Sequence, residues 1–502
     1  MRRRALPTAE KSMTFAPLRF RLADPTPGRR RQVGREALVA LAAGLSLASC
    51  EVGPDYSPPV IAFAPFHNAE AVEARAAREP PPPLDRWWTG FKDPELTRVI
   101  ERVFAENLNL QASMARANQA RAAAKAAGAK LGPTMDATAQ GTFERLSLEN
   151  PIAELGRASP GFERDGALYD VGGAAAWEVD LFGGLRRGEE AAQAEAEAAE
   201  AAQLGTRVMV AAEAADAYLQ IRGDQARLQV AERQVATERQ LRDLVTLRRA
   251  RGMGADREVA QAEALLAQAE GAVPLLRAAL DAQMNRLDVL MGAQPGADAA
   301  ELNDAAALPA IPRILASAAD LRRRPDVIAA ERRLAAANAR IGAAIAEYYP
   351  KLSLNGVLGN EAVETSHLIT PSTFQPLGGV GLRWRLFDFG RIDAEVEGAD
   401  AASREALLNY RSVVLRAAEE VENACMNLVQ LEAHARAAAA QIKALTRARD
   451  DSEEAYKGGL IALTDVLDAD RQLLAAEDDL PRTQTDAGRA AVSLFRASGG
   501  GW

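Results

Sequence analysis

The sequence predicts a mainly α-helical, internally duplicated protein that contributes four strands to a membrane β-barrel and continues as a long helical coiled coil. Three observations support this fold class: landmarks that recur about 207 residues apart, four segments that alternate apolar and polar residues, and two long helical stretches without proline. Only 5% of the residues are aromatic and alanine is abundant, which favours long helices over a thick globular core. The net charge of −9, with acids and bases interspersed, argues against a nucleic-acid partner.

The duplication is visible in matched landmarks. WEVDLFG at 177–183 is matched by WRLFDFG at 384–390, and Pro274 is matched by Pro481. A repeat this long is a duplicated half-protein and not a solenoid unit. The predicted organisation is a signal peptide with lipobox at 1–49, a lipid-anchored N-terminal linker and start of an equatorial region at 50–92, a first repeat at 93–296, an equatorial linker at 297–320, and a second repeat at 321–502.

Each repeat is expected to begin with a helix. Asp93 followed by Pro94 and Glu95 is typical of a helix start, with an N-cap, a first-turn proline and an acid matched to the helix dipole. An alanine-rich helix is then predicted over residues 101–130. Its counterpart in the second repeat is predicted from Pro325 to about Tyr348.

Two strands are predicted next in each repeat. Apolar and polar residues alternate in four segments, at 134–144, 169–181, 352–358 and 380–386. This length and period are typical of membrane strands with one apolar and one wet face, although a soluble sheet packed on a core is the alternative. Trp177 and Trp384 fall on the apolar faces. The charges expected to face the lumen are Glu178, Asp180, Arg383 and Arg385, and the loops at about 146–167 and 361–376 are expected outside the cell.

Very long helices follow the strands, at 185–250 and 392–457. Apolar residues recur every seven positions in the second helix, as in a coiled coil. This heptad series comprises Leu407, Val414, Val421, Leu428, Ala435 and Ile442 in one seam position, and Tyr410, Ala417, Ala424, Leu431, Ala438 and Leu445 in the other. A return helix is expected after each long helix, kinked or broken at Pro274 and Pro481.

Four strands cannot close a sheet within a bilayer, where every backbone group must be paired. Membrane barrels need about eight strands or more. Two copies would supply eight strands around a filled interior, whereas three copies would supply twelve around an open lumen. The chain is therefore expected to work as an oligomer.

The N-terminal region predicts export and lipid attachment. An apolar run at 37–48 follows Arg29, Arg30, Arg31 and Arg35, and the segment LASC at 47–50 resembles a bacterial lipobox, which predicts lipidation of Cys50. The alternative is an ordinary signal peptide followed by a chance cysteine. The leader before the apolar run is long, so the start codon is expected downstream, for instance at Val33. Glu51 follows the cysteine, which favours the outer membrane.

Several motifs together resemble the TolC-like outer-membrane efflux factors, in particular their lipoprotein (NodT-type) branch. They are CEVGPDY at 50–56, WWTGFKDPEL at 87–96, RRPDV at 323–327, LFDFGR at 386–391 and GGGW at 499–502. The resemblance implies a homotrimer, a twelve-stranded barrel, a periplasmic helical barrel, and an equatorial region built from the chain ends and the middle linker.

The function expected from this resemblance is a passive exit duct for small molecules, drugs or metals, in a tripartite efflux system. The partners would be outer-membrane lipid, a periplasmic adaptor and an inner-membrane pump, expected to be proton-driven. The alternatives are type I protein secretion and a structural coiled-coil lipoprotein without a pore. No enzyme is expected: the sequence has no GxxxxGK[S/T] or GxSxG motif, and His67, His367 and His434 are isolated. No metal and no cofactor apart from the lipid on Cys50 are expected, and Cys425 is expected to pack as a small residue and not to act in redox chemistry.

The far ends of the helical hairpins carry the remaining candidate residues. The aperture candidates are Thr464, Asp465 and Asp468, with Asp256 and Glu258 in the first repeat. The alternative for these acids is that they complement the dipoles of the return helices. The adaptor-docking candidates at the tips are Arg251, Gly252, Gly254, Lys457, Gly458 and Gly459.

Overall fold

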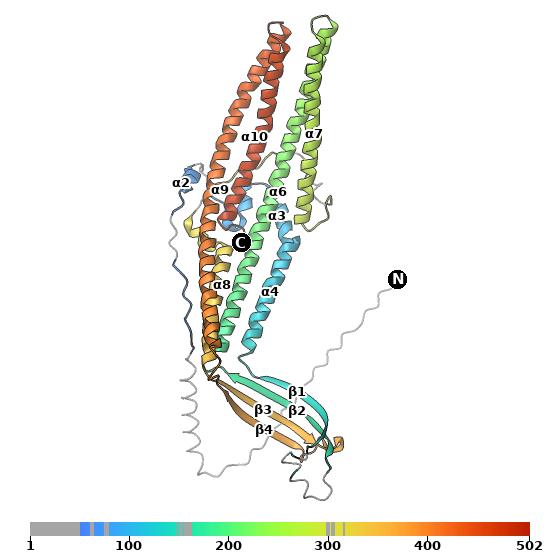
Figure 1. The fold of residues 1–502 in the computed structure, drawn as a ribbon. Coiled ribbons are helices and arrows are strands. Elements are labelled where there is room, and N and C mark those ends of the chain that lie inside the picture. The colour runs from blue at the N-terminus through green and yellow to red at the C-terminus, as the bar shows by residue number, and fades with distance from the viewer. Residues whose placement is uncertain are drawn as a thin grey trace, which may run out of the picture. The chain divides into compact units, whose positions relative to one another are not determined.

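A computed structural model describes residues 51–60, 65–74, 80–147, 149, 154, 163–297, 302, 307–314 and 317–502 (Figure 1). The chain from Glu51 to Trp502 forms one compact unit. The predicted signal peptide, Cys50, and much of the loop predicted at 146–167 lie outside the described residues.

The four strands form one antiparallel sheet in the order β1-β2-β3-β4. Their bounds are Thr134–Arg145 (β1), Asp165–Val179 (β2), Lys351–Ala362 (β3) and Phe374–Arg383 (β4). The four predicted strands are thus confirmed. A short 3-10 turn, η5 (Thr365–His367), lies between β3 and β4.

Several predicted strand limits are wrong. β2 begins four residues earlier, β3 ends four residues later and β4 begins six residues earlier than predicted, so the loops predicted at 146–167 and 361–376 are shorter. The predicted C-terminal ends of β2 and β4 are too long by two and three residues. β4 stops at Arg383, which pairs with Lys351, because the next partner would be Pro350, which has no backbone N–H to donate. β2 stops at Val179 because the chain then turns: the carboxylate of Asp180 accepts a hydrogen bond from the Arg186 backbone N–H at 2.9 Å.

The helical hairpins follow the strands. α6 (Gly184–Ala250) returns as α7 (Asp256–Leu290), and α9 (Arg391–Lys457) returns as α10 (Leu463–Ala497). Pro274 and Pro481 lie inside continuous helices, so of the two expected outcomes, a kink or a break, the break is wrong, while the kink stays a prediction. Packing of each return helix against its long partner keeps the chain helical through the proline. The predicted heptad positions of α9 are confirmed: they are buried or half-buried.

Shorter helices surround the hairpins: α2 (Ala69–Ala74), η1 (Leu84–Phe91), α3 (Pro94–Glu106), α4 (Leu108–Ala129), η3 (Ala318–Arg323), α8 (Pro325–Ile345) and η4 (Ala346–Tyr348). Asp93 caps α3 as predicted, because its carboxylate accepts the N–H groups of Glu95 and Leu96. The single helix predicted over 101–130 is interrupted at Asn107. The side chain of Asn107 accepts the N–H of Leu110 at 2.9 Å and starts a second helix.

The duplication extends to the backbone angles. Three pairs of glycines, each pair 207 residues apart, have nearly equal positive φ: Gly183 (79°) and Gly390 (78°), Gly252 (74°) and Gly459 (75°), Gly292 (74°) and Gly499 (73°). Glycine adopts this left-handed conformation without the Cβ penalty, so the helix starts and ends of one half recur in the other. The indole Nε1 of Trp177 donates to Leu131 O at 2.8 Å, and that of Trp384 donates to Tyr348 O at 2.9 Å.

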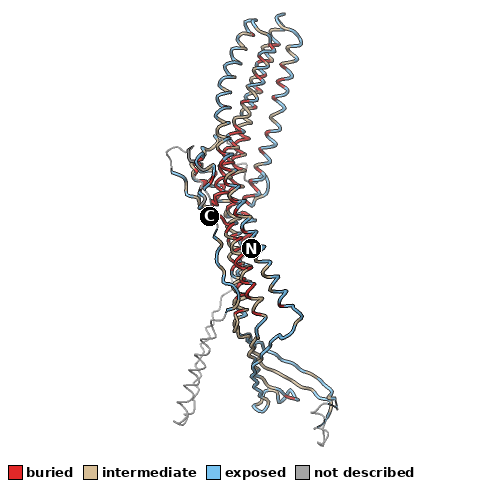
Figure 2. Tube along the Cα trace, turned by 60° about the vertical axis from the view of Figure 1, so that its left-hand side comes forward, coloured by how far each residue is buried: buried red, intermediate tan, exposed pale blue. Residues whose placement is uncertain are grey.

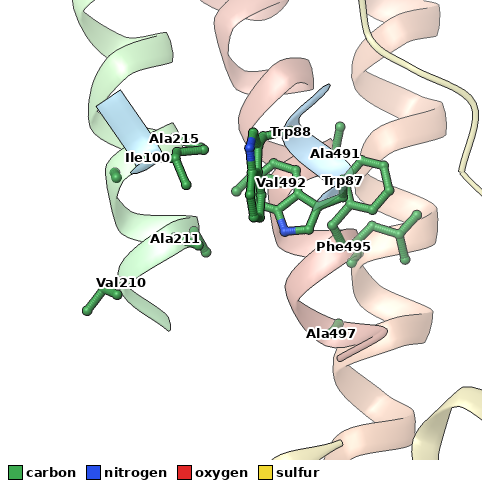
Figure 3. Packing of buried hydrophobic residues seen from close by; sticks show 14 of the residues in the cluster. Trp87, Trp88, Ile100, Val210, Ala211, Ala215, Ala491, Val492, Phe495 and Ala497 are labelled. Atoms are coloured by element: carbon green, nitrogen blue, oxygen red, sulfur yellow. The ribbon is translucent and has the colours of Figure 1, made fainter. Parts of the chain in front are cut away.

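Buried residues concentrate along the middle of the helices (Figure 2). The ring of Trp87 stacks on Phe495 with a centroid distance of 5.1 Å (Figure 3). The backbone N–H of Gly501 donates to Leu84 O at 2.7 Å. Leu302 and Ile314, from the linker between the halves, belong to the same core cluster. The segment at 84–91, the C-terminal residues and the middle linker therefore meet in one core.

Candidate functional site

The sheet has one exposed apolar face. The cross-strand pairs Met135 with Ala175, Trp177 with Leu354, and Leu354 with Val380 place the apolar sets of all four strands on the same side. Met135, Phe143 and Val380 are between 71% and 75% exposed on this side. A soluble sheet would cover this face with its own core, so the sheet is of the membrane type.

The opposite face is mainly polar. Asp136, Thr138, Gln140 and Thr142 of β1 lie on it, although Val357 and Leu377 also face this side. Glu178 pairs with Ser353, and Lys351 pairs with Arg383, so Glu178 and Arg383 share this face as predicted from their alternation. Placement at the wet lumen stays a prediction for these two.

The structure corrects the strand placement of the other two lumen candidates. Asp180 lies beyond β2, and its carboxylate is 3.4 Å from the guanidinium of Arg186. Arg385 lies beyond β4, where its Nη1 is 3.8 Å from Glu347. Both charges therefore belong to the junction between strands and helices.

Among the residues that the structure describes, the two edge strands, β1 and β4, each pair with another strand on one side only. An unpaired row of backbone N–H and C=O groups is costly in lipid, and it is the ordinary template for another strand. The sheet therefore needs further strands from copies of the chain.

The hairpin tips lie next to one another. Arg248, near the end of α6, donates from Nη1 to Tyr456 O at 2.8 Å and lies 4.3 Å above the Tyr456 ring. Beneath this contact is an apolar cluster comprising Leu241, Val245, Ala262, Tyr456, Leu463 and Val466. The predicted docking candidates Arg251, Gly252, Lys457, Gly458 and Gly459 are exposed in the turns, and Gly254 is half-buried.

Two apolar residues in these turns were missed by the sequence analysis. Met253 is 56% exposed and Leu460 is 82% exposed. The signal was available, since each apolar side chain stands between or beside glycines at the end of a long helix.

The aperture candidates divide into two groups. The carboxylates of Glu258 and Asp465 accept hydrogen bonds from the Ala255 and Ala462 N–H groups at 3.3 and 3.2 Å, and thus cap the return helices. Asp256 forms an ion pair with Arg249. All three acids lie in the first turns of the return helices, where the alternative places them, and their aperture role stays a prediction.

Thr464 and Asp468 are both exposed, one turn apart on α10. The carboxylate of Asp468 accepts hydrogen bonds from Arg471 and from Gln472, the latter at 2.8 Å. These hydrogen bonds, that of Arg471 foremost, lower the pKa of Asp468 below its ordinary value. Asp468 therefore keeps a negative charge at neutral pH on the surface of the tip.

The segment that follows Cys50 is fixed to the junction of sheet and helices. Val52 N–H donates to Phe182 O at 3.1 Å, and Tyr56 Oη donates to Glu331 at 2.6 Å. The side chain of Arg187 is 4% exposed and forms ion pairs with Glu51, Asp55 and Glu190 at 3.3, 2.7 and 2.7 Å.

Arg187 was also missed by the sequence analysis. A cation in the first turn of a helix opposes the helix dipole, which is the signal that could have identified it. Its three carboxylate partners offset that unfavourable placement.

Cys425 is fully buried, and burial raises the pKa of its thiol to about 11. The protonated thiol packs as a small residue, as predicted. His434 contacts Asp479 at 2.9 Å and His367 lies 3.8 Å from Glu364. Within the described ranges, no group of three or more metal-ligating side chains is present. The described helices also include none that combines the length and apolarity needed to cross a membrane.

An exposed apolar sheet face with two free edges, joined to long helical hairpins, defines a membrane channel assembled from several copies. The profile of the outer membrane efflux protein family matches residues 99–293 and 317–500. The chain belongs to this family.

Two curated relatives illustrate the likeness. The pyoverdine export outer membrane protein OpmQ of Pseudomonas putida is 31% identical over 470 residues, covering 93% of this chain and 97% of OpmQ. Nodulation protein T of Rhizobium leguminosarum bv. trifolii is 28% identical, covering 91% and 96% of the two chains. The predicted resemblance to the NodT-type branch is thereby confirmed.

Solved structures show the same fold. The outer-membrane channel OprN superposes with a TM-score of 0.81 at 32% identity, covering 90% of this chain and all of OprN. VceC of Vibrio cholerae superposes with a TM-score of 0.76 at 26% identity, covering 84% and 99%. The predicted fold class, a trimeric twelve-stranded barrel continued by a helical barrel, is confirmed.

The chain is thus the outer-membrane channel of a tripartite efflux system, and it extends into the periplasm. It is a transport duct and not an enzyme. The alternative of a spacer without a pore is wrong, because the family is one of efflux channels and the chain carries the membrane sheet. Channels of this kind work with an adaptor and an inner-membrane pump.

Proposed function

We propose that this chain forms a passive exit duct for small molecules, delivered by a proton-driven inner-membrane pump through an adaptor. The observation that carries the proposal is the sheet, whose exposed apolar face and two free edges require a shared barrel. Relatives named for pyoverdine export and for toluene efflux favour small organic cargo over proteins. The energy comes from the pump, because the sequence has no phosphate-binding loop.

We also propose that Cys50 carries a covalently attached lipid that anchors the chain in the outer membrane. The next residue, Glu51, forms an ion pair with Arg187. The backbone N–H of Val52 donates a hydrogen bond to the backbone oxygen of Phe182, three residues after the end of β2. The residues that directly follow Cys50 in the sequence are thus held at the junction of strands and helices. Mass spectrometry of the mature N-terminal peptide tests this: a diacylglyceryl adduct is expected, and an unmodified Cys50 thiol contradicts it.

The tips are proposed to dock the adaptor and to narrow the duct. Met253 and Leu460 would supply apolar contacts to the adaptor, beside the turn residues Arg251, Gly252, Gly254, Lys457, Gly458 and Gly459. Three copies of Thr464 and Asp468 would form a polar, acidic ring at the aperture. Glu178 and Arg383 would line the barrel lumen, where mixed charge gives no sharp ion preference.

Purified trimer in planar bilayers tests the duct and its aperture. The wild-type channel is expected to conduct, and Asp468→Ala is expected to conduct more because each aperture loses three charged side chains. Glu232→Ala is the control, because Glu232 is an exposed acid of α6 that pairs with Arg277 and is not an aperture candidate. A trimer that never conducts contradicts the duct. Equal conductance of the wild type and Asp468→Ala contradicts the aperture.

A further inference from the structure

A buried group of charged side chains joins the two hairpins below their tips. It consists of Glu238 on α6, Arg449 on α9 and Asp470 on α10. Glu238 is 1% exposed and Asp470 is 3% exposed, so water does not reach either carboxyl group. Because α6 belongs to the first hairpin and the other two helices to the second, this group lies at the boundary between the hairpins.

Arg449 is shared among several carboxylates. Its Nε donates to Asp470 Oδ1 at 2.9 Å, and its Nη1 lies 2.6 Å from Glu453 and 3.3 Å from Asp450. Within the described part of the chain, neither carboxyl oxygen of Glu238 has a hydrogen-bond partner, and Asp470 Oδ2 has none either. An ionised Glu238 would thus be a buried charge without a donor.

The surroundings of Glu238 contain little to stabilise a negative charge. The charge of Asp470 repels it and that of Arg449 attracts it. α7 packs on this part of α6 through the apolar residues Ala262, Leu266 and Ala269. Burial in the first place, and Asp470 in the second, raise the pKa of Glu238 to about 7.

We propose that Glu238 is a proton-binding site at the boundary between the two hairpins, and that the bound proton holds the hairpins together near the tips. A neutral carboxyl group is tolerated in this apolar setting, whereas a carboxylate without a donor is not. Ionisation therefore favours separation of α6 from α9 and α10, which lets water reach Glu238. The proton site rests on buried geometry alone, while its effect on conductance also rests on the proposed duct.

The direction of the pH effect follows from the raised pKa. The packed arrangement binds a proton up to about pH 7, whereas a hydrated glutamate releases it near 4.5. The packed arrangement is therefore most favoured below about pH 4.5, and it is weakened progressively as the pH rises from about 4.5 to about 7, where the loss is complete. Since each pKa unit corresponds to a tenfold change in equilibrium, the full effect is on the order of a hundredfold.

Infrared spectroscopy of the purified trimer tests the proton site. The wild type is expected to show a protonated carboxyl band that disappears as the pH rises through about 7. Glu238→Gln, which keeps the shape of the side chain, is expected to lose this band. Glu232→Gln is the control, because Glu232 is an exposed residue of α6 that pairs with Arg277. An unchanged band in Glu238→Gln overturns the proposal.

Bilayer conductance between about pH 5 and 8 tests the effect of the proton on the tips. Wild type and Glu232→Gln are expected to conduct more as the pH rises, and Glu238→Gln is expected to be insensitive to pH. Asp470→Asn is expected to shift the wild-type midpoint to lower pH, since it removes the repulsion and frees Arg449 to pair with Glu238. A Glu238→Gln channel with the wild-type pH dependence overturns the coupling. Absence of conductance in all variants contradicts the duct, and the infrared band still decides the proton site.

Discussion

In each half of the chain a phenylalanine follows the second strand, but within the described residues only the phenylalanine of the first half is packed against another part of the chain. Phe182 follows β2 and Phe389 follows β4, at matching positions of the repeat. The ring of Phe182 stacks on Tyr349 with a centroid distance of 4.6 Å. Phe389, in contrast, is 92% exposed and contacts the ring of Phe387.

The difference marks where one chain ends and the next copy begins. β2 pairs with β3, and Tyr349 stands just before β3 in the same chain. Among the described residues β4 has no such neighbour, and the residue before β1 that matches Tyr349 is Gly132, which has no ring. We therefore expect Phe389 to be covered by another copy of the chain, by a contact different from the Phe182–Tyr349 stack. The first-half junction is thus internal to the chain, while the second-half junction is a boundary between copies.

The largest effect is expected from a charge on the apolar face that both halves share. Leu358 lies on this face in β3 and is 58% exposed, while its neighbour Val357 lies on the opposite face and is 39% exposed. Leu358→Arg is expected to destabilise the folded barrel by about 2–4 kcal/mol, the range for a cation at the bilayer midplane. Urea unfolding in vesicles measures the change. Val357→Arg should be much milder, and an equal loss in both variants would mean that the faces are assigned wrongly.

The next effect concerns the segment that covers the first-half junction. Arg187→Ala removes a buried guanidinium from Glu51, Asp55 and Glu190, and we expect a loss of about 1–3 kcal/mol, since its partners are partly exposed. Thermal unfolding and protease cleavage between residues 51 and 56 should both report it. The control is Arg340→Ala, which breaks one exposed pair with Glu195 and should cost less than about 1 kcal/mol. Equal behaviour of the two variants would contradict the role of Arg187.

The comparison of the two phenylalanines can be sharpened directly. Phe182→Ala is expected to destabilise each chain by about 1–2 kcal/mol, less than a fully buried Phe because the side chain is only half-buried. Phe389→Ala is expected to leave the chain fold intact but to weaken the trimer, so that the trimer dissociates at protein concentrations at which the wild type stays assembled. Circular dichroism and size-exclusion chromatography separate the two effects. Identical results would show that the halves do not differ in this respect.

The smallest effect is expected where the halves agree. Trp177→Phe and Trp384→Phe each remove one indole hydrogen bond to a backbone carbonyl, to Leu131 and to Tyr348. Each is expected to cost about 0.5–1.5 kcal/mol in urea unfolding. If the losses of unfolding free energy in the two variants differ by more than about 1 kcal/mol, the two hydrogen bonds do not contribute equally to stability.

Period-two and heptad patterns made much of the fold predictable. The strands and the long helices have one apolar face each, and that spacing is visible in the sequence. The ends of strands and the breaks between helices were harder to predict, because each depends on a single group. Examples are Pro350, which has no backbone N–H, and the side-chain amide of Asn107, which caps a helix.

The site was less predictable because its contacts are tertiary. Arg187 meets residues 51 and 55 from more than a hundred positions away. Glu238 is one of many acids on an alanine-rich helix whose composition does not show which face is buried. Asp465 and Glu258 could be aperture or cap from sequence alone, and only the geometry shows that they cap.

The central claim is that copies of the chain complete one barrel, with β4 of one copy beside β1 of the next. Thr134 begins β1 and Arg383 ends β4. In one chain they are separated by at least the width of the four-stranded sheet, about 14 Å at 4.8 Å per strand. They are also offset along the strands, because the register places Thr134 level with Gly379, through Ala176 and Asn355. The direct measurement is cross-linking of Thr134→Cys/Arg383→Cys in detergent with a bis-maleimide shorter than that width. We predict covalent products of two and three chains and none larger. Exclusive recovery of single chains from a folded preparation would contradict the claim.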